Sequence, residues 1–176
     1  MKKTALLLSV AAGISAFAQS SPIIIQNYNV YDAAGRFRTA PAGGTPGPIM
    51  YAGHNAPYGT YTIPAGQFTQ YQSFSTAGTT PIPILNWYVS DNTNPANNGM
   101  YAYNHPFIAT VMNYANEWAS FHFVIQDPVT GASDEYKLGD PTIDPAYSNS
   151  LTGSISSADW FTITTPNGPT TYVQIF

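Results

Sequence analysis

Proline and glycine restrict this chain more than any other feature, because they interrupt it at short intervals along most of its length. The sequence contains fifteen Pro and fourteen Gly. Proline inside a helix removes a hydrogen bond and clashes with the preceding turn. The spacing therefore leaves little room for long helices and favours short strands joined by turns.

Apolar residues between these breaks recur with a period of two, as in a strand with one buried face. Ala119, Phe121, Phe123 and Ile125 share one face of segment 118–126, and the same alternation groups residues 85, 87 and 89 as a core face with Trp87 at its centre. About nine or ten such strands predict two packed sheets. We expect an all-β protein, an antiparallel two-sheet β-sandwich of the jelly-roll or immunoglobulin-like type.

Two hairpins are predicted from turn residues between alternating segments. Segment 118–126 leads into a turn at 127–131, and 133–138 returns. Segment 160–165 leads into Pro-Asn-Gly-Pro, and 170–176 returns. Glycine after asparagine supplies the positive φ that tight hairpin turns need.

Residues 105–118 fit two descriptions. Phe107, Val111, Tyr114 and Trp118 have helical spacing, with Pro106 suited to a first helical turn. The segment also contains β-branched residues, which favour strands. We predict two strands and keep a helix as the alternative.

The first eighteen residues have the order of a secretory signal peptide. Lys2 and Lys3 precede an uncharged apolar run, and Ala16-Phe17-Ala18 supplies the small residues of a cleavage site. The run is too short to form a transmembrane helix. We expect residues 1–18 to be a signal peptide and residues 19–176 to be one β-sandwich domain of a secreted protein, either periplasmic or extracellular.

Charge and cysteine content narrow the function classes. The sequence has no Cys, which excludes disulfides and thiolate chemistry. Beyond residue 18, three basic residues stand against nine acidic ones, a net charge of about −6 with His neutral. This acidic balance argues against nucleic acid and against anionic lipid as partners.

No catalytic motif is present: the sequence lacks a Gly-x-Ser-x-Gly elbow, a His-Glu-x-x-His pair and a phosphate-binding glycine loop. Glu117 and Glu135 are the only glutamates, and a glycosidase would need two carboxylates about 5–10 Å apart. We favour ordinary surface roles for both, and a non-catalytic protein.

Acidic residues concentrate between positions 127 and 144, where five of the nine lie. Carboxylates on loops are ligands that Ca²⁺ prefers. The candidate ligands are Asp127, Asp134, Asp140 and Asp144. The alternative, which we favour, is that these residues begin turns. No other cofactor is predicted.

Aromatic residues give the main candidate binding site. If Phe121 and Phe123 face inward, and Phe161 and Ile163 likewise, alternation directs their neighbours outward. Aromatic rings on a sheet face bind sugars or protein partners. The alternative for each ring is burial beneath a loop or a second sheet. The candidate ligand-binding residues are Trp118, His122, Trp160, Tyr172, Tyr101 and Tyr103.

Two main hypotheses follow. The first is a secreted, non-catalytic binding module that contacts glycans, envelope polymers or a protein surface. The second is a structural envelope protein that self-assembles into homo-oligomers through exposed strands. A small hydrolase or a membrane-active protein is a third class, which no specific residue in the sequence supports.

Overall fold

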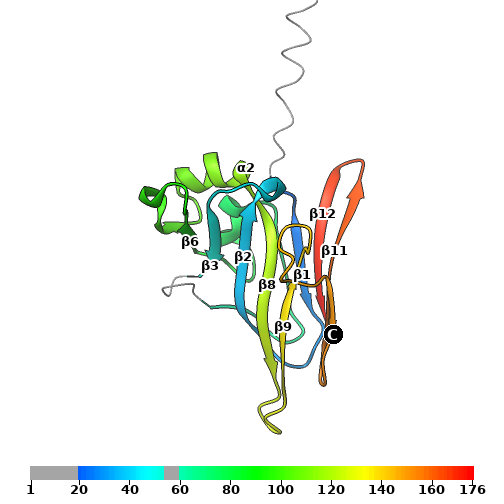
Figure 1. The fold of residues 1–176 in the computed structure, drawn as a ribbon. Coiled ribbons are helices and arrows are strands. Elements are labelled where there is room, and N and C mark those ends of the chain that lie inside the picture. The colour runs from blue at the N-terminus through cyan, green and yellow to red at the C-terminus, as the bar shows by residue number, and fades with distance from the viewer. Residues whose placement is uncertain (1–19, 54–59) are drawn as a thin grey trace, which may run out of the picture.

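The computed structural model describes residues 20–53 and 60–176, and these form two β-sheets packed face to face (Figure 1). This confirms the prediction of an all-β, two-sheet sandwich. The jelly-roll or immunoglobulin-like type stays a prediction, and the predicted signal peptide of residues 1–18 lies outside the described residues.

One sheet has five strands in the order β10-β11-β12-β1-β5. Its centre is a parallel pair, β1 with β12, so the sheet is mixed rather than wholly antiparallel as predicted. The other pairings, β10–β11, β11–β12 and β1–β5, are antiparallel. The strands are β10 (Ser150–Thr152), β11 (Ser157–Thr165), β12 (Gly168–Ile175), β1 (Ile23–Asn27) and β5 (Phe68–Tyr71).

The second sheet has seven strands, of which six follow the order β7-β6-β3-β2-β8-β9. The seventh, β4, pairs with the first part of β2, and β3 pairs with a later part of the same strand. The strands are β7 (Gly99–Ala102), β6 (Asn86–Ser90), β3 (Ile49–Ala52), β2 (Ala33–Pro41), β8 (Asn116–Gln126), β9 (Ser133–Gly139) and β4 (Tyr61–Ile63).

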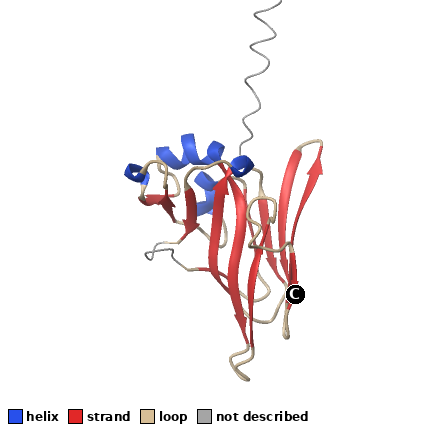
Figure 2. Cartoon of the chain, viewed as in Figure 1, coloured by secondary structure: helices blue, strands red, loops and turns tan. Residues whose placement is uncertain are grey.

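Short helices gather toward one end of the sandwich (Figure 2). No helix in the described ranges has the length and apolar character needed to cross a bilayer. The helical segments are η1 (Ala42–Gly44), η2 (Phe74–Thr79), η3 (Pro95–Asn97), η4 (Ile108–Met112) and α2 (Asn113–Ala115).

The prediction of two strands for residues 105–118 is wrong over its first part. Residues from Ile108 to Ala115 are helical, with wide π-helical turns at the start, and β8 begins only at Asn116. Ile108 and Met112 lie four residues apart and are fully buried, whereas Val111 and Tyr114 are exposed. Packing of this Ile108–Met112 pair against the core outweighs the β-branched residues.

The core is rich in aromatic rings that surround Phe37 of β2. Its ring stacks on Tyr61 at 5.1 Å and on Trp118 at 5.2 Å, and meets Phe121 edge-on at 5.8 Å. Such pairs add about 0.5–1.5 kcal/mol each beyond the burial of their area. The core therefore stabilises the sandwich without disulfides.

Both predicted hairpins are confirmed. β8 and β9 pair from Ser120↔Gly139 to Gln126↔Ser133. β11 and β12 pair out to Thr165↔Gly168, and Gly168 has a φ of 108°. Every residue of β11 from 161 to 165 is exposed, because this end of the hairpin extends beyond the opposite sheet (Figure 1).

Candidate functional site

Trp118 does not face solvent, as the alternation predicted, but lies in the core with 3% of its surface exposed. Arg38 pairs with Ser120 and Thr39 with Trp118, so Ala119 is an extra residue in β8. Such a β-bulge shifts the in-and-out alternation by one position. The Trp118 indole N–H donates to the Ser21 carbonyl at 2.7 Å, which fixes the ring as a structural element.

Trp160 is also buried, at 4% exposure, so its prediction as an outward residue is wrong. Ala158 and Trp160 face the core, and Phe161 and Ile163 face solvent. The prediction inverted the two faces because the apolar alternation of β11 continues past the point where the opposite sheet ends.

Tyr101 of β7 and Tyr103, just after the end of that strand, are half-buried and pack against the core. The Tyr101 hydroxyl donates to the Asn97 carbonyl at 3.0 Å, and its ring meets Phe107 at 5.2 Å. Tyr103 lies flat against the backbone at Gly78, where an added Cβ would strike the ring. Both tyrosines therefore hold the helical end of the molecule together.

His122 faces outward on the seven-stranded sheet, as predicted. Its Nε2 lies 2.6 Å from the Glu135 carboxylate on β9. Tyr172 lies outward on the other sheet. The structure therefore distributes the six aromatic and histidine candidates over the core, the helical end and two opposite faces, and brings no binding site together from them.

The four candidate calcium ligands do not converge. Asp127 and Asp140 each accept from a backbone N–H and a threonine hydroxyl of their own turn. Asp144 accepts from the Ala146 N–H and pairs with Arg38 at 2.6 Å. Within residues 20–53 and 60–176, no three His, Cys, Asp or Glu side chains are placed to hold a metal. The structure therefore does not bring the four candidate ligands together: Asp127 and Asp140 serve their own turns, and Asp144 also pairs with Arg38 of β2.

Asp134 is the fourth candidate and ties β9 to the turn between β10 and β11. Its carboxylate accepts from the backbone N–H groups of Ser154 and Ile155 and from the hydroxyls of Ser154 and Ser156, all at 2.8–2.9 Å. Burial alone would raise the pKa of this carboxyl, but these donors outweigh it and lower the pKa below the ordinary value. Asp134 is a structural clamp.

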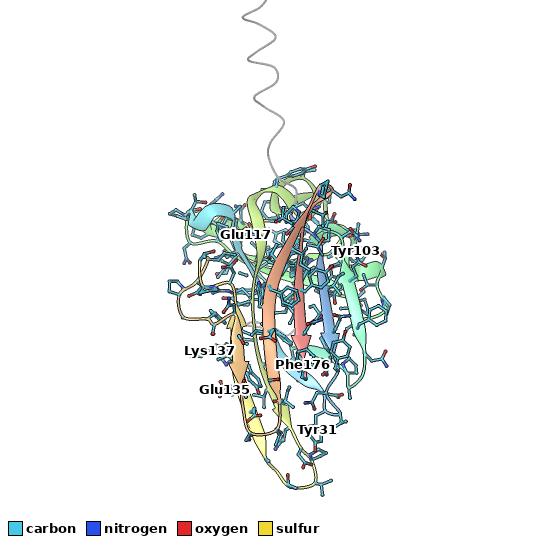
Figure 3. All side chains as sticks on the ribbon, turned by 90° about the vertical axis from the view of Figure 1, so that its right-hand side faces the viewer. Tyr31, Tyr103, Glu117, Glu135, Lys137 and Phe176 are labelled. Atoms are coloured by element: carbon cyan, nitrogen blue, oxygen red, sulfur yellow. The ribbon has the colours of Figure 1, made fainter. Side chains whose placement is uncertain are left out.

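The two glutamates are far apart. Glu117 accepts from the Gly43 N–H at 3.0 Å near the helical end. Glu135 pairs with Val124, seven residues further along β8, which places the glutamates about 20 Å apart. Figure 3 shows the two at different heights, Glu117 toward the upper end of the molecule and Glu135 lower at its edge. They cannot act as a pair of catalytic carboxylates.

The outer side of the five-stranded sheet presents a different set of residues, of which the sequence analysis named only Tyr172. We call it the neutral face. Its side chains alternate with the buried positions of β11, β12, β1 and β5. The neutral face comprises Ile24, Gln26, Tyr28, Phe68, Gln70, Asp159, Phe161, Ile163, Thr170, Tyr172, Gln174 and Phe176, and Asp159 is its one charged member.

Two rungs cross the neutral face from strand to strand. In the first, Phe161 pairs with Tyr172, and Tyr172 with Ile24. The Phe161 and Tyr172 rings stack with centroids 5.3 Å apart and planes 9° from parallel. Phe161 keeps 37% of its surface exposed. The rung is an apolar ridge open to solvent.

The second rung carries amides. Gln174 pairs with Gln26, and the Gln174 amide donates to the Gln26 side-chain oxygen at 2.9 Å. Gln26 in turn pairs with Phe68 of the edge strand. The bond between the glutamines uses one donor and one acceptor, so each amide keeps further hydrogen-bonding capacity.

A second aromatic pair closes the neutral face beyond the amide rung. Tyr28 and Phe176 stack with centroids 5.5 Å apart. Figure 3 views this face directly, with β11, β12 and β1 running together and Phe176 at the end of β12. Four residues along β12 separate Tyr172 from Phe176, which places the two stacks about 13 Å apart.

The five strands of this sheet contain one charged residue, Asp159, which pairs directly with Gln174 and so stands on the amide rung itself. A flat surface with two aromatic pairs, bridging amides and almost no charge can pack against apolar C–H groups and exchange hydrogen bonds with hydroxyls. The chemistry fits binding.

Comparison with known proteins adds no relative to this description. No protein-family model, curated protein sequence or solved structure matches the chain.

Proposed function

We propose that this protein is a secreted, non-catalytic binding module whose neutral face holds a neutral polysaccharide chain of the cell envelope or its surroundings. The observation that carries the proposal is the Phe161–Tyr172 stack beside the bonded Gln26–Gln174 pair. Exposed rings give apolar contact area at low entropic cost, and amides give direction.

Lack of charge is the reason to choose a neutral ligand. An anionic polymer would find no ion-pair partner on a face that carries no Lys or Arg, and the single Asp159 offers little to a cationic one. Hydroxyl groups of a sugar chain are neutral donors and acceptors and suit the hydrogen-bonding capacity that the paired glutamine amides retain. The aromatic pairs lie far enough apart for a short oligosaccharide to touch both.

Self-assembly is the second candidate function, and one observation favours it. β10 pairs with β11 only from Ser157 to Asp159, so the edge of β11 from 161 to 165 is open. An open edge strand offers N–H and C=O groups to a strand of another copy. This candidate predicts concentration-dependent oligomers that form without any polysaccharide.

Co-sedimentation of the purified protein with insoluble chitin and cellulose tests the proposal. Neutral binding predicts a saturable bound fraction that persists at high ionic strength, because screening by salt affects charged contacts. Folded protein that stays in the supernatant with both polymers contradicts it. Sedimentation that is independent of polymer and rises with protein concentration supports self-assembly instead.

A further inference from the structure

The opposite side of the sandwich concentrates positive charge. Every Lys and Arg among the described residues lies on the outer side of the seven-stranded sheet: Arg36 and Arg38 on β2 and Lys137 on β9. Arg36 pairs with His122, and His122 with Lys137, so three adjacent strands carry basic residues on one rung. The rung spans about 10 Å.

The rung places Arg36 and Lys137 on the two strands that flank His122, so this face carries two positive charges about 10 Å apart. Glu135 offsets part of the charge by its contact with His122. The Lys137 ammonium makes no ion pair with any other part of the described chain. It is therefore available to an external anion.

A hollow of about 580 Å³ lies beside Lys137 on the same face. Tyr147, Pro145 and Leu151 form its apolar walls, and Glu135 borders it. Figure 3 shows Lys137 and Glu135 next to each other at the edge of the molecule. An ammonium at the rim of a mixed polar and apolar hollow with one aromatic wall suits a ligand with both an anionic group and an apolar face.

The wall of this hollow is held in place by Arg38. Its guanidinium bonds Asp144 at 2.6 Å and lies over the Tyr147 ring at 5.2 Å. The backbone N–H of Ser148 donates to the Lys137 carbonyl at 3.0 Å. The segment carrying Tyr147 is therefore fixed against β9 before any ligand arrives, which lowers the entropic cost of binding.

We infer that this hollow binds an acidic sugar, with the sugar carboxylate on the Lys137 ammonium and the sugar ring against Tyr147 and Leu151. Arg36, two strands away on the same rung, adds positive charge to this face. This second site lies on different strands from the neutral face and binds a ligand of different chemistry. The two sites can therefore be tested independently.

Titration calorimetry of the purified protein with a galacturonic acid trisaccharide tests the inference, with the uncharged galactose trisaccharide as the matched ligand. The acidic trisaccharide binds and the neutral one does not. Lys137→Gln weakens the affinity about tenfold, because a charge-assisted contact is lost. Lys137→Arg keeps the charge and stays within about threefold.

Three results overturn the inference: no heat of binding from folded protein, equal binding of the galactose trisaccharide, or unchanged affinity in Lys137→Gln. Acetate and inorganic phosphate serve as control ligands, because each carries negative charge without a sugar ring. Either ion matching the affinity of the trisaccharide would show that the walls of the hollow contribute nothing and would overturn the sugar assignment.

Discussion

Phe161 and Tyr172 stack across the β11–β12 hairpin with ring centroids 5.3 Å apart and ring planes 9° from parallel. The stack stands on the solvent side of the sheet, so it stabilises the hairpin only modestly. We expect Phe161→Ala and Tyr172→Ala each to cost about 1 kcal/mol in the free energy of unfolding, with a coupling of about 0.5–1 kcal/mol between them. Urea unfolding of the double-mutant cycle measures this, and a single loss above about 3 kcal/mol would place the ring in the core.

Trp118 is expected to behave in the opposite way. Trp118→Ala removes a buried ring that stacks on Phe37, and should cost about 3–5 kcal/mol in the free energy of unfolding. Tyr114→Ala is the matched control, because Tyr114 is an aromatic residue with 50% of its surface exposed. It should change stability by less than about 0.5 kcal/mol. Equal losses in the two variants would contradict the assigned burial.

Asp134 is expected to link stability to pH. Its folded-state pKa lies below its unfolded value, so its contribution is present at neutral pH and is lost as the pH falls below about 4. Asp134→Asn should lose about 2–3 kcal/mol at neutral pH and show a flatter loss of stability in acid. Thermal melts between neutral and acidic pH check this. An unchanged slope in the variant would exclude Asp134 as a source of the acid sensitivity.

Gly153 tests the same clamp from the other side. A Cβ at this position would fall on the Asp134 carboxylate and 2.5 Å from the Tyr136 hydroxyl, both of which are held by hydrogen bonds. Gly153→Ala should cost about 1–3 kcal/mol in the free energy of unfolding. Gly47→Ala meets only the Pro41 ring at 3.2 Å and should be close to neutral. A tolerated Gly153→Ala would mean that the turn relaxes easily.

The sequence predicted the positions of the strands better than it predicted which of their side chains face the core. Both hairpins and the core positions of Trp87, Phe121 and Phe123 agree with the structure, because turn residues and period-two alternation are local signals. Leu85, predicted to share the core face of Trp87, precedes β6 and is exposed. Alternation holds only while a residue stays in the strand.

The errors at Trp118 and Trp160 have different causes. The bulge at Ala119 inverts the alternation of β8, and no local residue pattern reports where a bulge falls. For Trp160, the sequence did contain a signal that could have corrected the prediction. Residues directly paired in an antiparallel hairpin share a face, so an outward Tyr172 requires an outward Phe161 once the turn fixes their pairing.

Only some residues of the candidate sites could be predicted from the sequence. The neutral face joins β11 and β12 to β1, which is more than a hundred residues away in sequence, through a parallel pairing that no turn signal announces. The basic rung likewise joins Arg36 to residues 122 and 137. Such faces depend on strand order, which hydrophobic alternation does not encode.

The most direct test of the neutral face is the affinity of the Phe161→Ala/Tyr172→Ala double variant for insoluble chitin and cellulose, measured beside wild type and Tyr114→Ala. We predict that wild type and Tyr114→Ala bind one of these polymers with equal affinity. The double variant, still folded by circular dichroism, should bind at least about tenfold more weakly, because it loses two exposed rings. A double variant that binds as tightly as wild type would show that the neutral face is not the binding surface.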